Sequence, residues 1–393
     1  MAAPLIQRAA AVVGVCILAL MLYLNYGYYN RHMEEQPVGP VHSYLDAYKC
    51  KSLIAGSPVE ISETTSTING KLAGQCRLKN LHVMPDPTHV DDSVLVMVVY
   101  NNAESWGKGR SVHNFIDLVK LFDYPLKKIS LGILTSSPDE YHALKDIFTS
   151  ELRHTPSFAQ SAASLDIPSS YRRRVSLVLR QDFSIDVSRD GRKADNVQKE
   201  RRRMLARYRN YALTQSLEPW HVHVVWIDSD IVEIPSALVS KMVHGASHMF
   251  TNLVDVVVAD KDVLEPICFV QGTEAEYDLN AWRGNRAVPT ADELHAMHQG
   301  KLFVPHDGPG MVHINHVRDH EYYPLDSVGG TMLYVKADIH RQGVLFATHY
   351  VIGSEWKHEG YDGIETEGLC YVAGMLGYKC WAMPQDVIYH ASN

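Results

Sequence analysis

Continuous apolar runs alternate with segments of helical spacing through the middle of the chain. The runs include "SVLVMVVY" (93–100), "KKISLGILTSS" (127–137), "RVSLVLRQDF" (174–183) and "HVHVVWIDSD" (221–230). An unbroken apolar run indicates a strand buried on both faces. Strands that alternate with helices predict a mostly parallel central sheet covered on both sides, an α/β fold of the doubly wound kind.

Composition narrows the class of partner. The chain has 393 residues, of which 46% are hydrophobic and 21% charged, enough for one large or two smaller domains with a real core. Its formal net charge of -8 excludes the net basic surface of a nucleic-acid binder. Small molecules, sugars and proteins are the expected partners.

The N-terminus has the pattern of a membrane anchor. Residues 9–29 are uncharged and mostly apolar, end among tyrosines, and as a helix would span roughly 30 Å. The alternative is a cleaved signal peptide, but no small-x-small site follows the run. We expect a short cytoplasmic tail at 1–8, a signal anchor at 9–29 and a turn-rich stem at 30–91. The short span suits an early-secretory membrane.

The six cysteines give only a weak indication of the redox compartment. Cys16 lies in the anchor, and no C-x-x-C spacing or His/Cys cluster predicts a zinc site. In a lumenal domain Cys50 could pair with Cys76 and Cys370 with Cys380. Free buried thiols are an equal alternative.

Two aspartates, Asp228 and Asp230, end the fourth apolar run. Ligands of open α/β sheets bind beyond the carboxyl ends of strands. In an extended segment the two side chains would share a face, and paired carboxylates suit Mg²⁺ or Mn²⁺. The alternatives are an Asp-rich turn, or the nucleophilic loop of an aspartyl-phosphate phosphatase of the haloacid-dehalogenase type. Three strand-helix units precede the motif, which disfavours the phosphatase.

Arg209 and Asn210 precede this strand on a helical segment, and an R-N pair leading into strand-D-x-D resembles nucleotide-sugar glycosyltransferases of the GT-A fold. The segments "YDLNAW", "VGGTMLYVKADIHRQGVLF" and "DGIETEGLCYVAGMLGYKCWAMP" further resemble the fungal mannan-polymerase subunits, glycosyltransferase family 62. The likeness covers residues 92–393. It implies a Golgi type II membrane protein with a lumenal GT-A domain that transfers mannose from GDP-mannose to α-mannan or N-glycans.

The resemblance implies a role for several groups of residues. Asp228, Asp230 and His390 would hold Mn²⁺ or Mg²⁺. The donor nucleotide-sugar would contact residues of the first loop, the R-N pair and a glycine pair: Asn101, Asn102, Glu104, Arg209, Asn210, Gly329 and Gly330. The sugar and acceptor side would be lined by Asp278, Asn280 and Trp282.

Glu365 and Glu367 in "GIETEG" are the expected catalytic carboxylates beside the acceptor, together with Asp228 and Asp230. A helix starting there would equally favour acids in its first turn. Transfer from an α-linked donor to an α-mannoside retains configuration, so these glutamates need only orient the acceptor or shield an oxocarbenium ion. The competing hypothesis is a non-catalytic subunit of this fold inside a hetero-oligomeric mannosyltransferase complex.

Overall fold

The computed structural model describes residues 50–53, 59–83, 92–153, 174–182, 195–246 and 261–392, all within the compact unit Cys50–Asn393. The anchor predicted at residues 9–29 lies outside these ranges. Among the described residues, no helix combines the length and apolar character needed to cross a bilayer.

The predicted alternation of strands and helices is confirmed between residues 94 and 227. The elements are β4 (Val94–Tyr100), α3 (Val112–Lys120), β5 (Ile129–Thr135), α4 (Pro138–Arg153), β6 (Arg174–Arg180), α6 (Asp195–Ser216) and β7 (His223–Ile227). Strands β6, β5, β4 and β7 are neighbours and pair in parallel. The short helices η3 (Ala103–Trp106) and η4 (Leu126–Lys128) flank this region. The α/β class therefore holds for this half of the sheet.

The rest of the sheet is mixed, so the expectation of a mostly parallel sheet is wrong. Its strands are β8 (Ile231–Glu233), β9 (Val263–Val270), β12 (Tyr323–Leu325), β13 (Met332–Lys336) and β14 (Cys380–His390). Strand β13 runs antiparallel between β7 and β9, whereas β14 is parallel to β9 and antiparallel to β12 and β8. Antiparallel pairings are therefore the majority in this half of the sheet.

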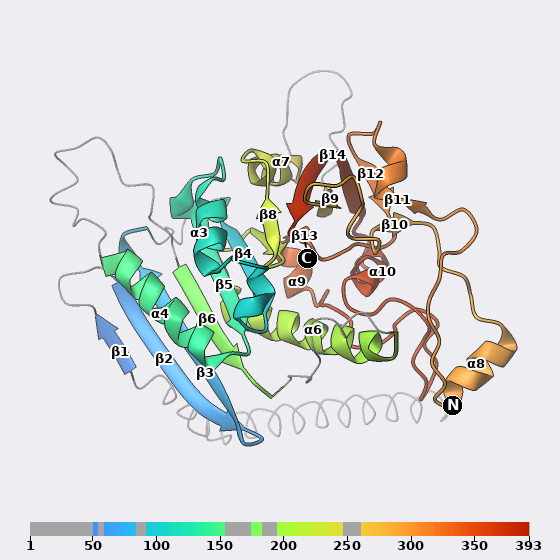
Figure 1. The fold of residues 1–393 in the computed structure, drawn as a ribbon, viewed down its shortest axis with the longest axis horizontal. Helices are drawn as coiled ribbons and strands as arrows, with labels where there is room; N and C mark the ends of the chain where they lie inside the picture. The colour runs from blue at the N-terminus through green and yellow to red at the C-terminus, as the bar shows by residue number, and fades with distance from the viewer. Residues whose placement is uncertain are drawn as a thin grey trace, which may run out of the picture. The chain divides into compact units, whose positions relative to one another are not determined.

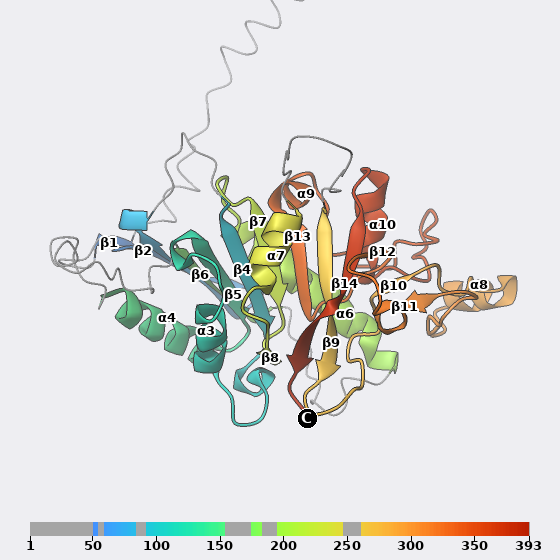
Figure 2. The ribbon, with the colours of Figure 1, turned by 90° about the horizontal axis from the view of Figure 1, so that it is seen from above.

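Helices cover both faces of the sheet (Figures 1 and 2). Helices α3, α4 and α7 (Leu238–Gly245) pack with β4, β5 and β6 in one apolar cluster. On the other face, α6, α9 (Ala337–Arg341) and α10 (Glu367–Met375) pack against β7, β9 and β13 in a second cluster. The remaining elements belong to the connections: β10 (Trp282–Arg283), α8 (Ala291–His298), β11 (Val312–His313) and η6 (Ile314–Val317).

Part of the predicted stem belongs to the sheet, so the boundary expected at residue 92 is wrong. Strands β1 (Cys50–Leu53), β2 (Val59–Ile68) and β3 (Lys71–Asn80) precede η2 (Leu81–Val83), and β3 pairs with β6. The turn between β2 and β3 is Asn69-Gly70, both with positive φ. An Asn-Gly pair between alternating strands is a strong hairpin signal. It is the feature of the sequence from which this element could have been predicted.

The two possible disulfides have different outcomes. Cys370 and Cys380 form a disulfide between α10 and the start of β14. Cys76 is buried and free. Cys50 pairs in register with Glu63, which pairs in turn with Cys76, so two inter-strand spacings of about 4.8 Å separate the two cysteines. That separation is too large for a disulfide.

Candidate functional site

The two aspartates lie in a turn, not in an extended strand. Strand β7 ends at Ile227, and the amide of Ile231 donates to the Asp228 carbonyl at 3.2 Å. The Asp228 amide donates to the carbonyl of Thr331 at 2.9 Å, which ties the turn to the amino end of β13. The expectation that both carboxylates share one strand face is therefore wrong. The turn sends Asp228 and Asp230 to different partners.

Arg209 is the centre of the first set of contacts. It lies on α6 and is only 3% exposed. Its guanidinium donates to Glu365 Oε1 at 2.7 Å, to Asp228 Oδ1 at 2.9 Å and to the carbonyl of Gly330 at 3.2 Å. A buried, charge-paired guanidinium with three acceptors is held in one orientation.

Asp228 lies among several carboxylates. Its withdrawal from water raises its pKa to about 6, Arg209 opposes the rise, and Asp230, Glu365 and Asp278 add to it. Because burial and neighbouring negative charges destabilise the ionised form of Asp228, an added cation would stabilise it. The carboxyl end of β7 is therefore suited to a positive ligand.

The glycine pair makes close backbone approach possible. A Cβ on Gly329 would lie 2.0 Å from Asp278 Oδ2, and one on Gly330 would lie 2.6 Å from the Arg209 guanidinium. The amide of Gly330 donates to Asp278 Oδ2 at 2.8 Å, and the amide of Asn280 donates to Asp278 Oδ1 at 3.2 Å. The structure thus brings together Arg209, Asp228, Asp278 and both glycines.

His390 ends β14 beside Asp230. Its Nδ1 donates to the Ala391 carbonyl at 2.7 Å, and its Nε2 lies 3.0 Å from Asp230 Oδ2. Tyr277 stacks on the imidazole, with ring centroids 3.6 Å apart. His390 is fully buried, so this orientation is fixed.

Asp230 and His390 are of the residue types that bind divalent cations, and the distance between them agrees with two neighbouring ligands. Neighbouring ligands in an octahedron of about 2.1 Å bonds are about 3.0 Å apart. The described residues contain no group of three or more His, Cys, Asp or Glu side chains arranged to hold a metal. A cation here would bind Asp230 and His390, with Asp228 nearby, and take its remaining ligands from water and phosphate, as Mg²⁺ usually does.

The loop after β4 contacts the same turn. Asn102 accepts the Glu104 amide at 3.2 Å and begins η3, while Asn101 and Glu104 are exposed. Ser229 Oγ donates to the carbonyl of Ser105 at 2.8 Å. The three residues of this loop that were predicted to bind the nucleotide-sugar donor therefore lie on a segment hydrogen-bonded to the aspartate turn.

Arg110, at the end of this loop, was not identified from the sequence. It donates to the carbonyl of Ile231 at 2.9 Å and to that of Trp106 at 3.2 Å, and the negative charge of Asp230 favours its charged form. It therefore ties the first loop to the residue that follows the aspartate pair. An isolated arginine in a loop carries no sequence signal for this role.

Glu367 belongs to a second set of contacts. It is the first residue of α10 and is 1% exposed. Arg202 lies 2.8 Å from its Oε2, and Arg286 donates to its Oε1 at 2.7 Å. Arg202 also donates to Asn280 Oδ1 at 2.9 Å. Glu367 and Asn280 are thus linked through one arginine.

Two predicted residues have internal roles. Both polar atoms of the Asn210 amide bind the backbone of Phe346, at 2.8 and 2.9 Å, so Asn210 fixes that segment rather than facing a ligand. Trp282 is buried, and its backbone pairs with Ser327. Both residues position the segments that carry the charged side chains.

Glu265 was missed in the sequence. It lies inside β9, is buried, and accepts the Gly329 amide at 2.7 Å. Burial raises its pKa well above the ordinary value, and Asp278 adds to the rise. An acid within the apolar strand "VLEPICFV" is a signal that would have identified it, because buried carboxylates need a specific partner.

The sequence comparisons with known proteins agree on one family. Residues 73–350 match the Anp1 family model. The mannan polymerase complex subunit mnn9 of Schizosaccharomyces pombe is 32% identical over 292 residues, covering 68% of this chain and 73% of that protein. The mannan polymerase I complex VAN1 subunit of Saccharomyces cerevisiae is 31% identical over 51% of this chain, which spans only 35% of that protein's length.

Among solved structures, the mannosyltransferase PcManGT from Pyrobaculum calidifontis, in complex with GDP-Man and Mn²⁺, is 13% identical. The match covers 79% of this chain and 59% of that one, with a TM-score of 0.41. The sequence comparisons establish the family, since the family model covers more than half of the chain. The chain belongs to the Anp1 family.

Proposed function

We propose that this protein is a metal-dependent retaining glycosyltransferase of the GT-A fold. It moves mannose from GDP-mannose to an α-mannan or N-glycan acceptor. The observation that carries the proposal is the edge formed by β7, β13 and β14. There the aspartate turn lies between a buried arginine and a buried histidine. Membership in a family that includes mannan polymerase subunits supports the choice of sugar.

The chain's own residues have separable tasks. Asp230 and His390, with Asp228, would hold a divalent cation, which supplies a Lewis acid for the leaving diphosphate. Arg209 fixes Asp228 and Glu365 and adds positive charge at the same place. The glycine pair lets the Asp278 carboxylate and the Arg209 guanidinium pack directly against the backbone before β13.

Glu365 and Glu367 act as positioning and electrostatic groups. Each is bonded to at least one arginine, so neither is poised as a strong general base. Retaining transfer does not need such a base. Glu365 has a positive φ of 59°. Its carboxylate contributes negative charge near the donor sugar, which favours an oxocarbenium-like state.

The location proposed is the Golgi lumen, with the chain anchored through residues 9–29 as a type II membrane protein. The Cys370–Cys380 disulfide supports an oxidising compartment, because disulfides persist there and are rare in the cytosol. Treatment of intact and opened membrane vesicles with protease would test the orientation. A lumenal domain is protected until the membrane is opened.

A second candidate is a non-catalytic subunit of a hetero-oligomeric mannosyltransferase. Relatives are named as subunits of mannan polymerase complexes, which favours partners for this chain as well. The described charged edge, with Asp228, Asp230 and His390 in place, favours catalysis by the chain itself. Family membership leaves the phosphatase alternative without support.

Calorimetric binding of GDP and UDP to the full-length protein, with and without Mn²⁺, tests the proposal. We expect GDP binding that requires Mn²⁺ and is lost in Asp230→Ala and Asp228→Ala. Asp117→Asn, an exposed carboxylate on α3, is the matched control. Hydrolysis of GDP-mannose that is abolished by Asp230→Ala establishes catalysis. Binding without any turnover would favour the subunit role, and metal-independent or absent binding would contradict the proposal.

A further inference from the structure

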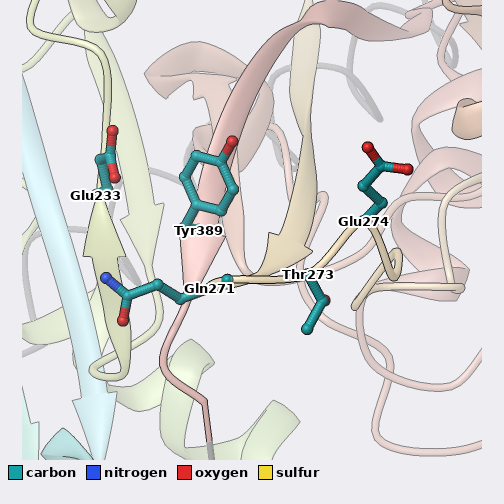
Figure 3. A pocket seen from close by; sticks show the side chains of 6 residues that line it. Glu233, Gln271, Thr273, Glu274 and Tyr389 are labelled. Atoms are coloured by element: carbon teal, nitrogen blue, oxygen red, sulfur yellow. The ribbon is translucent and has the colours of Figure 1, made fainter.

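A cavity of about 500 Å³ opens next to the candidate cation site. It is lined by residues from the ends of β8 and β14 and from the loop after β9: Glu233, Gln271, Gly272, Thr273, Glu274 and Tyr389 (Figure 3). A volume in this range is typical of pockets that bind small organic ligands. None of the roles assigned above uses these residues.

Backbone bonds join the cavity to the cation site. Tyr389 precedes His390 and pairs in register with Glu233 across β8 and β14. The amide of Gln271 donates to the His390 carbonyl at 2.8 Å, and the amide of Ala391 donates to the Asp230 carbonyl at 2.8 Å. The cavity therefore shares one rigid β8–β14–β9 junction with Asp230 and His390. Its lining is adjacent along the backbone to both residues proposed to bind the cation.

The lining selects against a phosphate and for hydroxyl groups. It contains two carboxylates, a carboxamide and a phenol, and among the residues that the structure describes no Lys, Arg or His lines it. Carboxylates accept hydrogen bonds from hydroxyl groups and repel anions. An aromatic ring beside them offers an apolar face, as sugar C–H groups require. An uncharged polyhydroxy ligand fits this combination.

The loop that carries Gln271 and Glu274 is fixed. Thr273 Oγ donates to the Val270 carbonyl at 3.0 Å and accepts the Ala275 amide at 3.1 Å. These bonds occupy the Thr273 hydroxyl, so Thr273 shapes the loop and leaves the ligand to its neighbours. In Figure 3, Glu233, Tyr389 and Glu274 point to the same side of the loop.

We propose that this cavity is the acceptor subsite and that it binds one mannose residue of the acceptor glycan. Glu233 and Glu274 accept its hydroxyl groups, Gln271 binds it through the amide, and the Tyr389 ring packs on its apolar face. This inference rests on the proposed function, since it names the acceptor side of the same site. It assigns substrate contact to residues that neither the D-x-D motif nor the family resemblance identified.

The test uses the full-length protein with methyl α-D-mannopyranoside and an α-linked mannobiose as probes. We expect Glu233→Gln to raise the acceptor KM by about tenfold, because one charged hydrogen bond is lost. Tyr389→Phe, which keeps the ring, changes it by less than about threefold. The donor KM and Mn²⁺-dependent GDP affinity stay unchanged in both variants. Asp117→Asn, in a second cavity of about 490 Å³ between α3 and α4, is the control and leaves every constant unchanged.

The outcomes separate the two proposals. An unchanged acceptor KM in Glu233→Gln and Glu274→Gln, with GDP binding intact, overturns the acceptor subsite and leaves the proposed function standing. Loss of a second bound Mn²⁺ in these variants overturns it too, because the carboxylates would then be a cation site. If the protein shows no turnover, mannobiose binding measured by calorimetry decides instead. Absence of GDP binding in the unsubstituted protein counts against the proposed function.

Discussion

The site has two ends that satisfy their charges differently. At the arginine end, formed by Arg209, Asp228, Glu365 and Gly330, one buried guanidinium meets three acceptors within 3.2 Å. At the histidine end, formed by Asp230 and His390, an imidazole nitrogen lies 3.0 Å from a carboxylate oxygen. The first end supplies its own cation, and at the second we propose that a divalent metal ion supplies one.

The two ends of the site therefore have different roles. Arg209 is always charged, so the arginine end is organised before any ligand arrives. The histidine end presents a carboxylate and an imidazole at the spacing of metal ligands. We therefore expect the arginine end to determine stability and the histidine end to determine response to metal. The predictions that follow separate the two.

The largest expected effect is at the arginine end. Arg209→Met leaves Asp228 and Glu365 without their cation and lowers the free energy of unfolding by about 3–5 kcal/mol. Arg207→Met, at an exposed position on the same helix, changes it by less than about 0.5 kcal/mol. Urea denaturation of the three proteins measures both values. Equal stability of the two variants would mean that the arginine end does not hold the fold.

A second buried histidine, His340, can be compared with His390. His340 is buried, donates from Nδ1 to the Val344 carbonyl and accepts at Nε2 from Trp226, so protein groups satisfy both nitrogens of a neutral ring. Burial lowers its pKa from 6.5 to about 4. Between these values the unfolded state binds more protons, so stability falls as pH drops through this window, by about 3 kcal/mol in total.

His340→Gln removes that contribution, because a neutral amide does not titrate. The difference in unfolding free energy between the two proteins, measured from pH 7 to pH 4, therefore shrinks as the pH falls. Other groups with shifted pKa, such as His223, cancel in the difference. A difference that does not vary with pH would show that His340 has the same pKa in the folded and the unfolded protein.

The histidine end predicts linkage to metal. At Mn²⁺ a hundredfold above its dissociation constant, the folded protein gains about 2.7 kcal/mol. Asp230→Asn and His390→Gln abolish this gain, while Asp117→Asn retains it. Thermal unfolding with and without Mn²⁺ measures the effect. A gain that persists in both site variants would place the cation elsewhere and break the contrast between the two ends.

The smallest effect concerns the ring that fixes His390. Tyr277→Leu removes the stack at 3.6 Å and lowers the free energy of unfolding by about 1 kcal/mol. Tyr277→Phe keeps the stack and separates the ring's contribution from that of the hydroxyl group. Chemical denaturation compares the two variants. A Phe variant as unstable as the Leu variant would assign the effect to the hydroxyl.

Part of the site could be predicted because its signals are local. The apolar strand that ends at Asp228 and the glycine pair at 329 and 330 are each legible in a few residues. The antiparallel hairpin of β2 and β3 was missed because its strands are polar, although Asn69-Gly70 marks its turn. The internal role of Asn210 could not be predicted, because its partner Phe346 lies 136 residues away.

The sequence by itself determined the alternating strands and helices of residues 94–227 and the position of the aspartate pair at the end of β7. Hydrophobic periodicity is a property of neighbouring residues, so one chain segment is enough to reveal it. Tertiary structure alone decided that Arg209 pairs with Glu365, 156 residues away, and that Asp230 meets His390. The strength of an ion pair depends on distance and burial, and both are set only when remote segments pack together.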